Sequence, residues 1–226
     1  MLSIVATEQW RAAHPAAAIG LLELSNLDNN RPAPPLDDRK REAEARLRER
    51  YAGFSRRDFT TLPVMAAYVA YYKRFDKTYH VLQQVESIAS KGKRLPDVSP
   101  LVDANFVAEV ETLVLTAGHD VQKLRGDVVI DASSDGDQLT QMGGASRTMR
   151  SGDMVMRDAD GVCCSILYGQ DNRSPISAAT THALYVAYAP AGVPAETVES
   201  HLRAVEAHVR LVCASAVTEQ RRLLSA

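Results

Sequence analysis

Polar side chains that could take part in chemistry gather between Pro100 and Tyr188. Most of them are neutral hydrogen-bonding residues, namely Asn105, Thr116, His119, Gln170, Asn172, Thr180, Thr181 and His182. The carboxylates available beside them are Asp103, Asp120 and Asp171. Such a set suits recognition of a small polar ligand, or hydrolysis of an activated ester in which positioning and oxyanion stabilisation carry the rate. We therefore expect the functional site in this segment.

The signatures of several common enzyme classes are missing from the sequence. It contains no G-x-S-x-G elbow, no G-x-G-x-x-G or phosphate-loop lysine, no H-E-x-x-H and no C-x-x-C. The polar set does not suit phosphoryl transfer or redox chemistry, and we expect no cofactor. His119 is the near-neutral base that we nominate. The alternative for His119 is that it only hydrogen-bonds the neighbouring chain and orients Asp120.

The histidines do not indicate a metal site. Six are scattered along the chain, and His201 and His208 lie one heptad apart on a predicted terminal helix. A zinc site needs three or four ligands, so we expect no metal and place these two histidines at the surface or facing a partner.

Composition is that of an ordinary globular protein. The 226 residues carry a net charge of −2, with 46% hydrophobic and 24% charged residues. The net charge therefore gives no overall electrostatic attraction to DNA or to a membrane. No apolar run reaches the ~20 residues that a membrane span needs, and the first ten residues do not resemble a signal peptide. We expect a cytoplasmic protein. Cys163 and Cys164 are expected to be buried thiols, not members of a disulfide framework.

The N-terminal part is predicted to be one buried strand followed by helices. Residues 16–24 form a compact apolar run, and residues 35–92 read as helical. Within the latter, residues 39–50 alternate in charge, which favours a solvated helix face with i to i+4 pairs. The alternative is an RNA-binding face, built from Arg39, Lys40, Arg46, Arg50, Arg56 and Arg57. Tyr68, Tyr71 and Tyr72 share one helix side and are expected in the core, with hydrogen-bonded hydroxyls.

The second half is predicted to change from helix to strands. A helix from Pro100 has an apolar face that includes Leu101, Val107 and Val110, and this spacing leaves Asp103, Asn105 and Glu109 on other faces. Strand-like runs follow at residues 113–115, 128–130, 154–156, 162–167 and 183–189. The pair Asp160-Gly161 indicates a hairpin, and residues 194–212 a closing helix.

This order of elements predicts an α+β fold. We expect a mainly antiparallel sheet or barrel-like β core with helices packed on it. A single domain over residues 1–226 is expected, with a recognisable core at about 78–190.

Two segments resemble a known family. Residues 101–107, Leu-Val-Asp-Ala-Asn-Phe-Val, and residues 117–126, Ala-Gly-His-Asp-Val-Gln-Lys-Leu-Arg-Gly, are similar to the B3/B4 domain of the phenylalanyl-tRNA synthetase beta subunit. In that domain a Val-Asp-x-x-Asn-aromatic-Val helix precedes a His-Ala-Phe-Asp-x-x-Lys-Leu-x-Gly loop. The likeness continues through Gly143-Gly144 and Gly169-Gln170-Asp171 to Thr180-Thr181.

The resemblance implies a site and an activity. The family module hydrolyses the ester of tRNA wrongly charged with tyrosine, and its helix asparagine matches Asn105. Its histidine falls at Ala117, with His119 in place of the phenylalanine, and its two glutamates fall at Gln170 and near Val186. Because an unpaired buried polar group costs on the order of 1–3 kcal/mol, these differences bear on tyrosine specificity.

The resemblance therefore predicts a free-standing B3/B4-like domain that binds the aminoacyl end of tRNA and acts as a trans-editing deacylase on mischarged tRNA. Together with the polar residues described above, it leads us to assign catalysis to His119 and Asn105, and substrate binding to Thr116, Gln170, Asn172, Thr180, Thr181 and His182. The likeness includes no synthetase catalytic domain, so we do not expect a tRNA ligase. The alternatives are a non-catalytic module that binds an amino acid or RNA, and a protein-interaction domain.

Overall fold

The computed structural model describes residues 2–226, and its elements alternate between helical and strand-rich stretches. The helices are α1 (Glu8–Ala13), α2 (Pro34–Arg50), α3 (Arg56–Thr61), α4 (Pro63–Lys73), α5 (His80–Lys91), α6 (Pro100–Thr112) and α7 (Ala195–Val212), with one 3-10 turn, η1 (Val121–Lys123). The strands are β1 (Ile4–Ala6), β2 (Ala18–Ser25), β3 (Thr116–Asp120), β4 (Val128–Ala132), β5 (Gln138–Thr140), β6 (Ser146–Thr148), β7 (Met154–Asp158), β8 (Gly161–Ser165), β9 (Gly169–Gln170), β10 (Ala183–Ala189) and β11 (Val217–Ser225).

Two open sheets carry most of the strands. The five-stranded sheet has the order β1-β4-β7-β8-β9, in which only β1 and β4 are parallel. The four-stranded sheet, β11-β2-β10-β3, is antiparallel throughout. The predicted α+β fold is confirmed, and so is the β7–β8 hairpin at Asp160-Gly161. The barrel-like alternative is not, because the strands described between residues 2 and 226 close no barrel.

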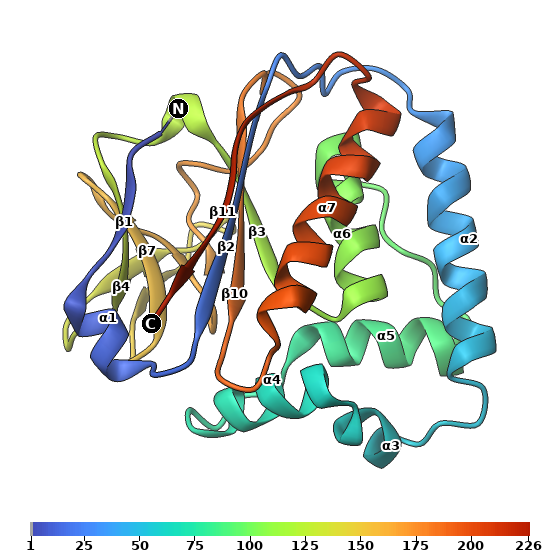
Figure 1. The fold of residues 1–226 in the computed structure, drawn as a ribbon, viewed down its shortest axis with the longest axis horizontal. Coiled ribbons are helices and arrows are strands. Elements are labelled where there is room, and N and C mark those ends of the chain that lie inside the picture. The colour runs from blue at the N-terminus through green and yellow to red at the C-terminus, as the bar shows by residue number, and fades with distance from the viewer. Residues whose placement is uncertain (1) are drawn as a thin grey trace.

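Helices α6 and α7 pack against one face of the four-stranded sheet. Figure 1 shows α7 and α6 beside β2, β10 and β3, with α2 beyond them and α4 and α5 across one end. Gly20 of β2 permits this packing, since a Cβ there would lie 2.7 Å from Val198 Cγ1 of α7. The sequence did not predict the short strands β5, β6 and β9. It also did not predict β1, which joins the edge of one sheet, or β11, which joins the edge of the other.

The charged helix α2 is not simply solvated. Lys40 and Glu44 are buried, contrary to the expected solvated face. Lys40 Nζ lies 2.6 Å from Asp103 Oδ2 and 2.5 Å from Asp97 Oδ1, so a buried ion pair joins α2 to α6. Arg39 binds Glu111 at 2.5 Å. Two members of the alternative RNA-binding set, Arg39 and Lys40, are thus engaged inside the protein.

The tyrosines of α4 are core residues, as predicted. Tyr68, Tyr71 and Tyr72 are buried. Their hydroxyls donate to the carbonyl of Tyr188 at 2.6 Å, to Asp153 Oδ1 at 2.7 Å and to the carbonyl of Ile166 at 2.5 Å. Such a satisfied buried stripe is a packing feature and not a stacking platform for bases.

The helix α6 is buried around most of its circumference. Asp103, Asn105 and Glu109 are all buried, although the sequence pattern had placed them away from the apolar face. The reason is that α2, α7 and β3 pack around different sides of α6. The expected strand at residues 113–115 is also wrong. Leu113 caps α6 with φ 67, and β3 begins at Thr116.

Two further predictions concern titratable side chains. His201 and His208 were expected at the surface or facing a partner, but both lie on the buried face of α7. Cys163 and Cys164 are buried free thiols, as expected. No helix among residues 2–226 combines the length and apolar character needed to cross a membrane.

Candidate functional site

A cavity of about 400 Å³ lies between α6, β3 and the segment around β8 and β9. Apolar side chains such as Val102, Phe106, Leu115, Ile176 and Tyr185 form most of its wall. The polar side chains on the lining include His80, Asn105, Glu109, Thr116, Ser165 and Gln170. A mainly apolar cavity with a few polar groups is typical of a site for a small molecule. Three of the residues predicted for the site, Asn105, Thr116 and Gln170, share this lining.

Asn105 projects from α6 into the cavity. Its Nδ2 donates to the carbonyl of Thr116 at 3.2 Å, which fixes the amide plane against β3. Its Oδ1 is buried and has no hydrogen-bond partner within the part of the chain that the structure describes. A buried acceptor without a partner is costly, so this oxygen is available to a ligand that brings a donor.

Glu109 lies one helical turn after Asn105 and also lines the cavity. Its Oε1 accepts a hydrogen bond of 2.7 Å from the backbone N–H of Thr116. Burial raises the pKa of Glu109 to about 8, against the weaker opposing effect of hydrogen bonds from Thr116 and Asn105. The carboxyl is therefore mostly protonated at pH 7. Sequence reasoning missed Glu109, although its i+4 spacing from Asn105 put both on one face of a helix.

Thr116 begins β3 and connects the cavity to the buried histidine of α7. Its hydroxyl contacts His201 Nε2, and the other ring nitrogen, Nδ1, lies 2.7 Å from Thr112 Oγ1. Burial lowers the pKa of His201 to about 3, so the ring is neutral. Both ring nitrogens are thereby satisfied by hydroxyl groups. His201 holds Thr116 in place and does not itself line the cavity.

Gln170 closes another side of the cavity from β9. Its Nε2 lies 2.7 Å from the carbonyl of Gly118 and 3.2 Å from that of Ser174. These contacts tie β9 to β3 and to the loop after Asp171. The two carbonyls thus take both hydrogens of the amide, and His119 Nδ1 is a further neighbour at 3.1 Å.

His119 lies next to Gln170 but outside the cavity lining. The ring is fully buried, and burial lowers the pKa of His119 to about 3. Its Nδ1 lies 2.7 Å from Ser174 Oγ, which donates its own proton to Asp171 Oδ1 at 2.6 Å. Ser174 must therefore accept from His119 Nδ1–H, which leaves Nε2 as a bare nitrogen. Because Nδ1 and Gln170 Nε2 are then both donors, their 3.1 Å approach is a packing contact and not a hydrogen bond. His119 therefore packs against Gln170 without hydrogen-bonding it.

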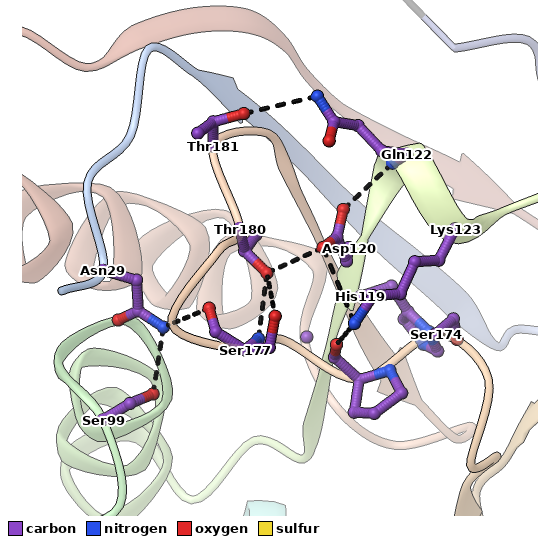
Figure 2. Close-up of polar contacts among 12 residues, drawn as sticks. Asn29, Ser99, His119, Asp120, Gln122, Lys123, Ser174, Ser177, Thr180 and Thr181 are labelled. Carbon is purple, nitrogen blue, oxygen red and sulfur yellow. Dashed lines mark hydrogen bonds and ion pairs between the residues drawn. The ribbon is translucent and has the colours of Figure 1, made fainter.

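The other predicted binding residues are not brought to the cavity. Thr180 is buried and donates to Asp120 Oδ2 at 2.8 Å, while exposed Thr181 accepts from Gln122 Nε2 at 3.3 Å. Figure 2 shows these side chains fastening the loop before β10 to β3. His182 pairs with buried Glu23 at 2.9 Å. Asn172 is exposed and is absent from the lining.

His80 stands at the mouth of the cavity and was not among the predicted site residues. It begins α5, is exposed and lines the opening. Partial desolvation of the ring lowers the pKa of His80 below 6.5, so the imidazole is neutral at pH 7. Nothing in the sequence around His80 marked it, because its distance from Asn105 along the chain hides their shared cavity.

Comparison with known proteins identifies the family. A model of the B3/4 domain matches residues 65–209, which is more than half of the chain. The chain belongs to the B3/4 domain family. The match includes α5, α6, β3, β8 and β9, and hence every element that carries a polar side chain named above on the cavity lining of this B3/4 domain.

A solved structure similar to this B3/4 domain is an N-terminal fragment of the phenylalanyl-tRNA synthetase beta-subunit from Pyrococcus horikoshii. The TM-score is 0.48 and the sequence identity 8%. The similarity covers 98% of this chain and 50% of that fragment, so the chain spans about half the length of the fragment. No curated protein matches the sequence.

Proposed function

We propose that this B3/4 domain binds the aminoacyl end of tRNA and hydrolyses the ester bond of mischarged aminoacyl-tRNA. The observation that carries the proposal is the cavity beneath α6, whose polar lining includes Asn105, Thr116 and Gln170 from the segments that bear the family motifs. The mainly apolar wall suits the side chain of an apolar amino acid. The proposed place of action is the cytoplasm.

The proposed reaction is a simple hydrolysis. The oxygen of a water molecule attacks the ester carbonyl carbon, and the bond between that carbon and the terminal ribose oxygen breaks. The ribose oxygen takes up a proton, and the products are a free amino acid and uncharged tRNA. Backbone N–H groups near Gly169, an exposed residue on the cavity lining, are the proposed donors to the developing oxyanion.

Proton transfer in this proposal does not use His119 directly. Its ring is outside the lining and its low pKa makes it a weak base. The proposed role of His119 is to position Gln170 through their contact. The neutral imidazole of His80 at the mouth, with help from a ribose hydroxyl of the substrate, is the better-placed group for moving a proton from water.

Deacylation of a panel of charged tRNAs tests the proposal. Wild-type protein is expected to release at least one apolar amino acid faster than the uncatalysed rate. Asn105→Ala is expected to slow this release by about tenfold or more, because it removes the only side-chain amide that α6 offers to the cavity. Asn172→Ala, outside the lining, is expected to change the rate little. If no tRNA in the panel is hydrolysed above background, the proposed enzyme activity is wrong.

A second candidate function is binding without hydrolysis. It is favoured by the electrical neutrality of the buried lining, since burial keeps the pKa of Glu109 near 8 and His119 lies outside. In that case aminoacyl-tRNA would protect the protein against thermal unfolding while its ester bond stayed intact. Measuring both quantities on the same samples separates the two functions.

A further inference from the structure

The cavity contains two neighbouring acceptor groups to which the proposed hydrolysis assigns no atom of the substrate. They are Asn105 Oδ1, which has no partner in the described part of the chain, and the carboxyl group of Glu109. Both residues come from the same face of α6, one turn apart, and both are at least nine-tenths buried. A pair of acceptors at this spacing suits a ligand group with several N–H donors.

Within residues 2–226, no cationic side chain is recorded beside Glu109. The nearest titratable groups on the packed elements are the hydroxyls of Tyr68, Tyr72 and Tyr79 and the ring of His201 beyond Thr116. Each of the three hydroxyls donates to a backbone carbonyl, namely that of Tyr188, Ile166 or Leu113. The ring of His201 is neutral and bound by two threonines. A positive charge for this carboxylate must therefore come from the ligand.

We infer that Asn105 Oδ1 and the Glu109 carboxylate bind the α-ammonium group of the aminoacyl moiety. This inference rests on the proposed function and narrows its substrate to aminoacyl esters with a free α-amine. An ammonium group has three donors, and it can give one to each of these acceptors. An N-acylated amino acid lacks the charge, and its acyl group would have to enter a buried corner between α6 and Thr116.

Binding of an ammonium ion beside Glu109 has a measurable consequence. The carboxyl is mostly protonated in the free protein at pH 7, because burial raises the pKa of Glu109 to about 8. A bound cation favours the carboxylate, so Glu109 releases its proton to solvent as the ligand binds. Proton release therefore reports direct contact between the ligand ammonium group and the Glu109 carboxylate. A Glu109 that only stabilised the fold would release no proton when the ligand binds.

The experiment uses L-phenylalaninol, L-leucinol and L-methioninol, together with their N-acetyl derivatives. These amino alcohols carry an ammonium group at pH 7 and have no ester to hydrolyse. Titration calorimetry in buffers of different ionisation enthalpy gives the affinity and the number of protons released. Wild-type protein is expected to bind at least one amino alcohol about tenfold or more tightly than its N-acetyl derivative, with release of nearly one proton.

Glu109→Gln is the decisive variant, and Glu111→Gln is its control. Glutamine keeps an oxygen for the Thr116 N–H, so the fold should persist, and a denaturant titration checks this. We expect Glu109→Gln to weaken amino-alcohol binding about tenfold and to abolish proton release. Glu111 pairs with Arg39 outside the lining, so Glu111→Gln should match the wild type.

Three results overturn the inference: equal affinity in wild-type protein and Glu109→Gln, equal affinity for the N-acetyl compounds, or no binding of any amino alcohol. The deacylation assay is a separate readout. Glu109-dependent binding without deacylation would retain the inference and reject hydrolysis. Deacylation that proceeds equally on N-acetylated aminoacyl-tRNA would retain hydrolysis and reject the inference.

Discussion

At the residue scale, Gly118 allows two residues of the cavity wall to pack closely against β3. It lies in the middle of β3, where its Cα faces Ile176 and Tyr185, two residues of the cavity wall. A Cβ at this position would lie 2.7 Å from Ile176 Cδ1 and 3.3 Å from Tyr185 Cε1. The absence of a side chain thus lets the loop after Asp171 close over β3.

The substitution Gly118→Ala tests this close approach. We expect it to lower the free energy of unfolding by about 1–3 kcal/mol, because Ile176 and Tyr185 must move to admit the methyl group. The displaced isoleucine should also weaken ligand binding in the cavity. Gly143→Ala is a matched control, since no atom lies within 4 Å of its added Cβ, and it should change stability by less than about 0.5 kcal/mol. Equal denaturant midpoints for the two variants would contradict this role of Gly118.

Part of the candidate site could be predicted from residue types alone. Asn105, Thr116 and Gln170 have polar side chains in a segment rich in hydrogen-bonding residues, and all three line the cavity. Glu109 was missed because an amphipathic reading of α6 allows one buried face, whereas this helix is enclosed on several sides. The placement of His119 depends on which face of β3 meets the cavity, and this is set by pairing with β10 and not by the local sequence.

At the scale of elements, a buried ion pair joins α2 to α6. Lys40 is fully buried and contacts Asp103, and Asp103 Oδ1 also accepts from the backbone N–H of Val98 at 3.0 Å. This network fixes the start of α6 and therefore the helix that carries Asn105. Removing the lysine leaves a buried carboxylate without its counter-charge, which is strongly destabilising.

The substitution Lys40→Met is expected to cost about 3–5 kcal/mol of unfolding free energy. Arg46→Met on the same helix is the control, because its 3.5 Å pair with Glu42 is exposed and contributes at most about 1 kcal/mol. The double variant Lys40→Met with Asp103→Leu should recover most of the loss, since it removes both charges. Denaturant unfolding of the three proteins measures these differences. A Lys40→Met protein as stable as Arg46→Met would show that the pair is not needed.

The terminal strand β11 completes the four-stranded sheet. It pairs with β2 along Val217–Ser225, and Gln220 Nε2 donates to Glu23 Oε2 at 2.5 Å. Deletion of residues 217–226 is expected to lower the unfolding midpoint and to promote aggregation, because it exposes the edge of β2. Deletion of Ala226 alone should change little. Light scattering and thermal unfolding measure the two effects, and an unchanged midpoint in the longer deletion would contradict this role.

The elements themselves were predictable to different extents. The helices α2, α4, α6 and α7 have long, well-marked sequence patterns, and the hairpin between β7 and β8 has its Asp-Gly turn. The edge strands β1 and β11 were missed. They are short or polar, and their strand conformation comes from partners distant in the chain.

At the scale of the whole molecule, buried titratable groups make stability depend on pH. Burial lowers the pKa of His119 and of His201 to about 3 and that of His14 and of His208 to about 4. The unfolded chain binds more protons than the native protein below pH 6.5, so these groups make stability fall as pH decreases. Burial also raises the pKa of Glu109 to about 8 and of Asp153 to about 7, which makes stability fall as pH rises toward 8.

We therefore expect the unfolding free energy to be greatest near pH 6.5. Each fully buried histidine contributes a slope of at most about 1.4 kcal/mol per pH unit on the acid side. His201→Gln should reduce the acid slope, and Glu109→Gln should reduce the decline above the maximum. Denaturant unfolding over a series of pH values measures these slopes. A stability that rises steadily to pH 8 and beyond would contradict the buried, protonated state of Glu109.

The cavity beneath α6 is proposed to receive the aminoacyl group. The most direct measurement is a crystal structure with a non-hydrolysable 3′-aminoacylamino-3′-deoxyadenosine that carries an apolar amino acid. We predict electron density for the amino-acid side chain against Phe106, Leu115 and Ile176, with the α-ammonium group beside Asn105 and Glu109. Density for the aminoacyl group elsewhere on the protein, with this cavity empty at saturating ligand, would contradict the claim.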